Sequence, residues 1–157
     1  MKFLIILTFF LTSVLISEEL KVKASQFSAD EKTGITIFTG NVNIVKGIDE
    51  INASKIVIFT NKKREPVKYI ATGNVSFYIK TEDSSFYKGK SQKVVYLPLK
   101  KEYQFFKDVR LEQIDDKKII IGEKVVLKTL EGKAYAKGAN KEPVIMIFNM
   151  PQDEEKK

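Results

Sequence analysis

Hydrophobic and polar residues alternate along most of the chain, in short runs that end at Gly, Asn, Asp or Lys. The hydrophobic positions hold mainly β-branched and aromatic residues, and the clearest runs are 35–38, 56–59, 75–78, 94–96, 119–121 and 144–148. A period of two with this composition is typical of β-strands that bury one face. No stretch combines a 3.6-residue period with helix caps, so we predict an all-β protein with little helix.

A repeat underlies this alternation. Four units begin with small or polar residues at 24, 53, 91 and 122 and end at 40–42, 73–75, 107–109 and 138–139. The ends read Gly-Asn-Val in the first two units, Lys-Asp-Val in the third and Gly-Ala in the fourth. The length of each unit can be taken from the third residue of its starting motif to the first residue of its closing motif. On this measure the four units cover residues 26–40, 55–73, 93–107 and 124–138. Only the second is longer, and we assign the excess to the polar loop 61–66.

Units of this length that hold only strands cannot bury an apolar face alone, so stacking of the units must supply the core. Each Gly-Asn step marks a backbone position that needs positive φ or close approach, as at a bulge or a bend. A single such step is equally consistent with an ordinary hairpin turn. Its recurrence favours bends aligned along one side of the stack.

Strand alternation assigns one consistently apolar face to the stack. It collects Val22, Phe27, Phe38, Val42, Ile44, Ile56, Ile58, Val75, Phe77, Val94, Tyr96, Val109, Leu111, Val125 and Leu127. These residues could simply pack against one another. Alternatively, sheets that stand apart could hold acyl chains between them.

The amino terminus has the pattern of a secretory signal. Met1 and Lys2 precede an apolar run over 3–16, which is shorter than the roughly 20 residues that span a bilayer. We predict a signal peptide over 1–17 cleaved after Ser17, with an uncleaved anchor as the alternative. A single domain over 18–151 and a charged, disordered tail over 152–157 would follow.

Removal of Lys2 with the leader leaves 26 basic and 20 acidic side chains, a net charge of 26 − 20 = +6. This excess indicates an anionic partner, although a lysine-rich solvated surface would give the same number. Because an exported protein rarely meets nucleic acid, we predict no nucleic-acid partner. Phosphorylated lipids and acidic glycolipids fit better.

The composition leaves little room for catalysis. The chain has no histidine and no cysteine, which removes the commonest general base, the thiolate nucleophile and nearly all structural zinc sites. The adjacent acidic pairs at 49–50, 82–83 and 115–116 lie among turn-forming polar residues, so we interpret them as solvated turns. We predict no enzyme, no metal and no cofactor.

Three groups of residues resemble a known family: the segment 51–58, the repeated Thr-Gly-Asn-Val at 39–42 and 72–75, and Gly-Glu-Lys-Val-Val at 122–126. In order and spacing they are similar to the LptA/OstA family of lipopolysaccharide-transport proteins. The resemblance implies a twisted antiparallel β-jellyroll with a slightly open, V-shaped section. It also implies a periplasmic protein that binds lipid A acyl chains inside its groove.

The resemblance further implies end-to-end assembly by β-strand pairing, for which the candidate edges are 20–26 and 143–150. The implied partners are lipopolysaccharide or lipooligosaccharide, an inner-membrane-anchored LptC-like protein, the amino-terminal domain of an outer-membrane LptD-like translocon, and further copies of the chain.

Position by position, the family's groove corresponds to Leu20, Val22, Phe77 and Tyr96 in this chain. Together with the apolar face given above, these form the predicted groove set. Basic residues that could meet lipid A phosphates at its rim are Lys21, Lys23, Lys62, Lys63 and Arg64, each of which could equally be a solvated surface charge. The changed steps at 107–108 and 138–139 leave the carboxy-terminal register open.

Three other functions remain to be separated from the carrier. One is the membrane-anchored member of the same fold, which keeps its amino-terminal helix. Another is a structural β-solenoid or adhesin that binds no lipid. The third is an enzyme acting on envelope glycans.

Overall fold

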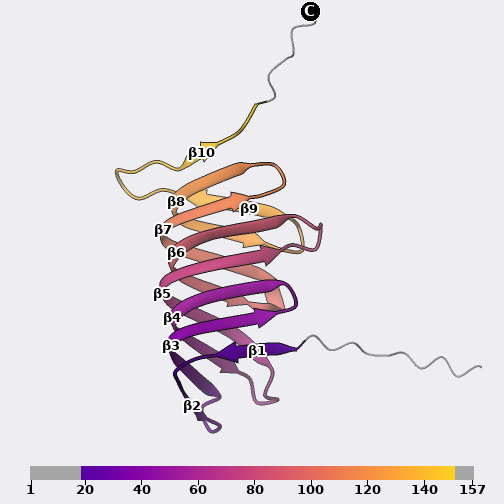
Figure 1. Cartoon of the computed structure of the whole chain (residues 1–157), viewed down its shortest axis with the longest axis vertical. Helices are drawn as coiled ribbons and strands as arrows, with labels where there is room; N and C mark the ends of the chain where they lie inside the picture. Colours follow the sequence, from indigo (N-terminus) through magenta and orange to yellow (C-terminus); the bar gives the residue numbers. More distant parts are fainter. Residues whose placement is uncertain (1–18, 151–157) are drawn as a thin grey trace, which may run out of the picture.

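Ten antiparallel strands stack along one axis in a computed structural model that describes residues 19–150 (Figure 1). The predicted signal peptide and the predicted tail lie outside the described residues. The strands are β1 (Leu20–Lys23), β2 (Gln26–Asp30), β3 (Ile35–Lys46), β4 (Asp49–Thr60), β5 (Pro66–Lys80), β6 (Phe86–Leu97), β7 (Glu102–Gln113), β8 (Lys118–Lys128), β9 (Lys133–Lys137) and β10 (Ile145–Ile147). Within residues 19–150 the one helical element is the 3-10 turn η1 (Pro98–Lys100). The all-β, open-sheet prediction is confirmed.

Each long strand bends in its middle, so its two halves belong to two facing walls. The pairing register shifts at every bend, between Thr39 and Val42 on β3 and between Thr72 and Val75 on β5, for example. The front wall holds β1, β10 and the halves 42–46, 49–53, 75–80, 86–91, 109–113 and 118–122. The back wall holds β2, β9 and the halves 35–39, 55–60, 66–72, 93–97, 102–106 and 124–128.

Small residues make the bends possible. Gly73 has φ +86°, and a Cβ placed on it would lie 2.5 Å from the Ser54 hydroxyl oxygen. Ser54 in turn donates a hydrogen bond to the Gly73 carbonyl oxygen at 3.2 Å, and Ser25 does the same to Gly40 at 3.1 Å. The serine at the start of each of these two units therefore packs on the glycine that bends the neighbouring strand, which explains why the two motifs recur together.

The third unit bends in the same way without glycine, because Lys107 and Asp108 take φ +62° and +51°. Asn41 and Asn74 also have positive φ, so the prediction of aligned bends is confirmed for three units. The fourth unit differs. β9 ends at Lys137, the following residues form a bridge between Ala139 and Glu142, and β10 then pairs with the other half of β8.

The two ends of the stack are sheet edges. Within the described residues, β1 and β2 pair only with β3, and β9 and β10 pair only with β8. These edge strands occupy opposite ends of the long axis (Figure 1). Among residues 19–150 no helix has the length and apolarity needed to cross a membrane.

Inward-facing side chains fill most of the space between the walls. Val75, Phe105, Val109, Val125 and Leu127 are completely buried. Burial of this kind is the main stabilising contribution to a domain that has neither disulfides nor a metal cluster among its described residues. The walls are therefore in close contact around these residues, and a second cavity of about 180 Å³, lined by Leu111, Ile120 and Met146 among others, lies near the carboxy-terminal end.

Candidate functional site

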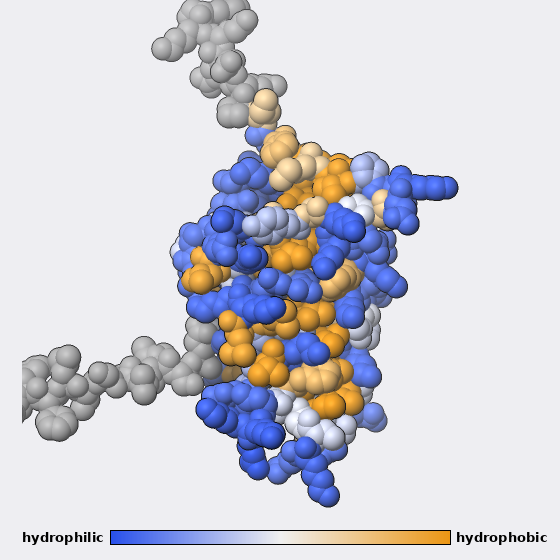
Figure 2. Space-filling model, turned by 180° about the vertical axis from the view of Figure 1, so that it is seen from behind, coloured by the Kyte–Doolittle hydropathy of each residue, from blue (hydrophilic) through white to orange (hydrophobic). Residues whose placement is uncertain are grey.

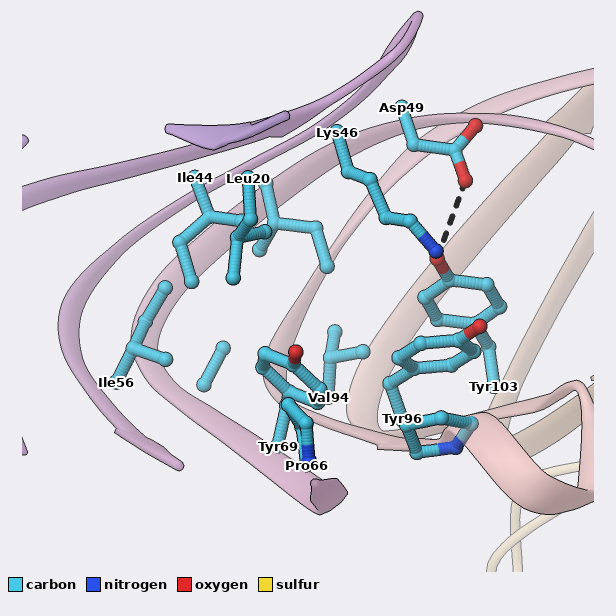
Figure 3. Close-up of a pocket in the computed structure, with 13 residues that line it drawn as sticks. Leu20, Ile44, Lys46, Asp49, Ile56, Pro66, Tyr69, Val94, Tyr96 and Tyr103 are labelled. Carbon is cyan, nitrogen blue, oxygen red and sulfur yellow. Dashed lines mark hydrogen bonds between the residues drawn. The ribbon is translucent and has the colours of Figure 1, made fainter. Parts of the chain in front are cut away.

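Nearer the amino-terminal end, the walls leave a cavity of about 280 Å³ between them (Figure 3). It is lined by Leu20, Ile44, Lys46, Asp49, Ile51, Ile56, Pro66, Tyr69, Ala71, Val94, Tyr96, Pro98 and Tyr103. Both walls contribute, and most of the lining side chains are aliphatic or aromatic. Such a surface offers water few hydrogen-bond partners, so it favours an apolar ligand.

Three tyrosines on successive strands form one side of the cavity. Tyr69, Tyr96 and Tyr103 are direct cross-strand partners on β5, β6 and β7. The ring centroids of Tyr69 and Tyr96 lie 5.7 Å apart, and those of Tyr96 and Tyr103 lie 4.2 Å apart. The rings provide a broad and rigid apolar surface, and a tyrosine hydroxyl can also form hydrogen bonds.

Polar groups are concentrated at one edge of the cavity, where Lys46, Asp49 and the Tyr103 hydroxyl come together in Figure 3. Tyr103, on the back wall, donates a hydrogen bond to Asp49 Oδ2, on the front wall, at 3.3 Å. Burial, and after it the neighbouring Asp49 carboxylate, raises the pKa of Tyr103 well above its ordinary value. The phenol therefore stays protonated and able to donate.

The structure brings together one part of the predicted groove set. Leu20, Ile44, Ile56, Val94 and Tyr96 line the cavity. Val22 and Phe38 are half-buried and pack against the core beside it.

The rest of the set lies elsewhere. Val42, Ile58, Val75, Phe77, Val109, Leu111, Val125 and Leu127 are buried in the core and do not line the cavity. Phe27 is 72% exposed, because its strand is the last of the back wall and only Phe38 stacks on it. A lipid-contact role for all these positions stays a prediction.

Sequence reasoning missed several lining residues, notably Tyr69, Tyr103 and Ile51. Alternation alone could have found them, since Tyr69 lies two residues before Ala71, and Tyr103 two before Phe105, on inward-facing positions. It also missed Lys46, the one lysine in the cavity lining. Of the predicted rim residues, Lys62, Lys63 and Arg64 lie in the β4–β5 turn, where Arg64 pairs with Glu31 at 3.2 Å.

The cavity has room for a short length of hydrocarbon. A methylene group is close in size to a water molecule, whose share of liquid volume is about 30 Å³, so about nine such groups would fill it. Besides Lys46, Asp49 and the three tyrosines, the cavity lining has no residue of a type that acts as a general acid, a general base or a nucleophile. Among the described residues no cluster of three or more acidic side chains could hold a metal ion.

Comparisons with known proteins agree with this architecture. Residues 21–133 match the family described as LptA/(LptD N-terminal domain) LPS transport protein. No curated protein matches the chain in sequence.

A crystal structure from Pseudomonas aeruginosa has a similar fold. It is described as LptH, the LptA homologous periplasmic component of the conserved lipopolysaccharide transport device. The TM-score is 0.75 at 16% sequence identity, and the alignment covers 85% of this chain and 96% of that one.

Proposed function

Since this chain belongs to the LptA/LptD N-terminal domain family of lipopolysaccharide transport proteins, we propose that it is a non-catalytic periplasmic carrier. Its cargo is lipopolysaccharide or lipooligosaccharide, and its binding site is the cavity between the two walls. The observation that carries this proposal is the apolar cavity itself, with its tyrosine side and its open edge at Lys46 and Asp49.

The energetics suit a carrier. Each methylene group removed from water contributes about 0.8 kcal/mol, so about nine of them contribute at most roughly 7 kcal/mol. Such binding is firm enough to shield an acyl chain and weak enough to release it. Lys46, at the cavity edge, is the basic group best placed to attract an anionic head group.

The resting cavity is too small for a lipid with several acyl chains, so the walls must separate further to admit one. Tyr103 and Asp49 connect the walls beside the cavity through one hydrogen bond. A single hydrogen bond contributes only about 1 kcal/mol, which is a small barrier to separation. Separation that starts there and proceeds toward Phe77 and Leu111 would give the buried members of the groove set contact with lipid.

The free edges provide a means of joining carriers in a line. β1 and β2 at one end, and β9 and β10 at the other, offer unpaired backbone groups to another strand. The apolar side chains around β10 are largely exposed, among them Ile145, Met146 and Phe148. We assign these ends to an LptC-like protein, an LptD-like translocon or a second copy of the chain.

We propose that residues 1–17 are a signal peptide that is cleaved after Ser17 during export. The intact mass of protein purified from the periplasm tests this. A mass that retains residues 1–17 would identify the chain as the membrane-anchored member of the same fold.

Photo-crosslinking tests the carrier function. Tyr69 lines the cavity, whereas Tyr78 on the same strand points outward and is 36% exposed. With p-benzoylphenylalanine at either position, lipopolysaccharide should become attached to the protein at Tyr69 and not at Tyr78. Equal attachment at both positions, or none at Tyr69, would count against the proposal.

A further inference from the structure

The outward surface of the back wall carries a continuous apolar row. Ile37, Val57, Ile70, Val95, Val126 and Tyr135 lie on neighbouring strands from β3 to β9. Each of them is a direct cross-strand partner of the next, except that Gln104 on β7 stands between Val95 and Val126. All are half-buried or exposed and none belongs to the core. Figure 2, the view from behind, shows hydrophobic residues in a broken strip along the long axis with hydrophilic residues on both sides.

Lysines flank this row on both sides. Toward the bends, the next outward row holds Lys55, Lys93, Lys124 and Lys137, and Phe106 stands between the second and third of these. On the other side lie Lys68, Lys128 and Lys133, and Glu131 in the β8–β9 turn pairs with both Lys128 (3.7 Å) and Lys133 (3.0 Å). Against these seven lysines stand three acidic residues, Asp30 and Glu102 on outward strand positions and Glu131 in that turn, which leaves 7 − 3 = +4.

The lysine side chains lie along apolar groups instead of extending freely. The ammonium groups of Lys93 and Lys124 stand 5.6 Å and 5.0 Å from the Phe106 ring centroid, and that of Lys68 stands 4.5 Å from Phe59. In this arrangement the hydrocarbon stem widens the apolar surface while the charge is held at its border.

The front wall shows that this layout is not a general property of the sheet. Its outward row next to the bends reads Lys23, Asn43, Asn52, Ser76, Lys90 and Arg110 across six strands and becomes apolar only at Ile121 and Ile145, on β8 and β10. Over those six strands the row is polar, as expected of a sheet face in contact with water. On the back wall, by contrast, the apolar row extends across seven strands. At about 4.8 Å between neighbouring strands, the row is about 29 Å long.

We propose that this back-wall face docks on the surface of an anionic lipid bilayer. Apolar side chains would enter the head-group region, and the two lysine rows would meet lipid phosphates on either side. The charge disfavours a second copy of the chain, because two such faces would place lysine rows against each other. The residues of the row do not line the cavity between the walls, nor three other cavities at the carboxy-terminal end, at the β2–β3 turn and at the bends. A deformable, extended surface therefore fits better than a protein that needs pockets for anchoring side chains.

Fluorescent labels locate the contact. Because the natural chain has no cysteine, Val95→Cys and Tyr78→Cys each give one labelling site, on the back and front outer faces respectively. With bimane on the full chain, vesicles of phosphatidylcholine and phosphatidylglycerol at seven to three, carrying bromine on their acyl chains, should quench the label at Val95 and not at Tyr78. Equal quenching at both positions, or none at Val95, would overturn the proposal.

Charge reversals test the role of the lysines. The variant Lys93→Glu/Lys124→Glu should bind these vesicles at least about tenfold more weakly than the natural chain. The matched variant Lys80→Glu/Lys90→Glu changes the charge equally on the front wall and should bind as before. Circular dichroism confirms that both variants fold. Equal weakening in the two variants, equally tight binding to pure phosphatidylcholine, or binding to polyglutamate without binding to vesicles would each contradict a bilayer contact.

Discussion

The ring of Tyr96 lies on the ring of Tyr103, with centroids 4.2 Å apart and planes inclined by 18°. Tyr103 also donates a hydrogen bond to Asp49 on the opposite wall, so the stacked pair connects the back wall to the front wall beside the cavity. The contact holds the tyrosine surface in place beside the cavity. Several properties of the protein should depend on it.

Removal of the Tyr103 hydroxyl should weaken the connection between the walls. Tyr103→Phe keeps the ring stack and loses the bond to Asp49, so the free energy of unfolding should fall by about 1 kcal/mol. Tyr78→Phe, on the outer surface, should change it by less than about 0.5 kcal/mol. Urea denaturation of the two variants measures both changes in the free energy of unfolding. Equal losses would mean that the hydrogen bond between Tyr103 and Asp49 does not stabilise the fold.

Stability should decrease in alkaline solution. Up to about pH 10, Tyr103 is protonated in both the folded and unfolded states and contributes no pH dependence. Above that pH the unfolded chain loses the proton, whereas the folded chain keeps it because the pKa of Tyr103 is raised well above its ordinary value. The free energy of unfolding therefore falls as pH rises beyond about 10.

Tyr103→Phe should make this decrease shallower, which denaturation at a series of pH values would show. A remaining slope is expected, because burial also raises the pKa of Tyr69 and Tyr87. An unchanged slope in the variant would mean that Tyr103 ionises freely in the folded protein.

Two adjacent phenylalanines should differ greatly in their contribution to stability. Phe105 is fully buried and its ring centroid lies 4.3 Å from that of Phe77, whereas Phe106 points outward between two lysines. Phe105→Ala should lower the free energy of unfolding by about 3–5 kcal/mol, and Phe106→Ala by less than about 1 kcal/mol. If the second substitution costs as much as the first, the inward and outward faces of β7 have been assigned wrongly.

The bend at Gly73 should not tolerate a side chain. Gly73→Ala would place a Cβ against Ser54 at a positive φ, and we expect a loss of about 2 kcal/mol. Gly122→Ala is the matched control, because its nearest contact would be the Lys137 carbonyl oxygen at 3.2 Å and no positive φ is required. Thermal unfolding should separate the two variants by several degrees.

The sequence predicted the bends and the strands because both depend on local chemistry. Gly40 and Gly73 mark the bends through their backbone freedom, and the same geometry recurs at Lys107 and Asp108 without that signal. In the third unit the neighbouring strands impose the bend, which no local pattern reveals. The interruption after Lys137 likewise depends on how β10 returns to pair with β8.

The limits of the cavity could not be predicted, since they depend on the distance between the walls at each level of the stack. Phe77 and Ile56 both occupy inward positions, yet Phe77 packs against Phe105 in the closed part and Ile56 reaches the cavity. Alternation gives the direction of a side chain and carries no information about what stands opposite. Phe27 shows the same limit at the end of the stack, where an inward position has no further strand to cover it.

Fluorine NMR tests the proposed lipid site most directly. The chain has six tyrosines, and fluorotyrosine would report on each of them. Tyr69, Tyr96 and Tyr103 line the cavity, whereas Tyr78 and Tyr135 are exposed on the two outer faces. Titration with lipopolysaccharide should shift the signals of the three cavity tyrosines and leave that of Tyr78 in place. Shifts that spare Tyr69, Tyr96 and Tyr103, or no shift at saturating lipid, would contradict binding between the walls.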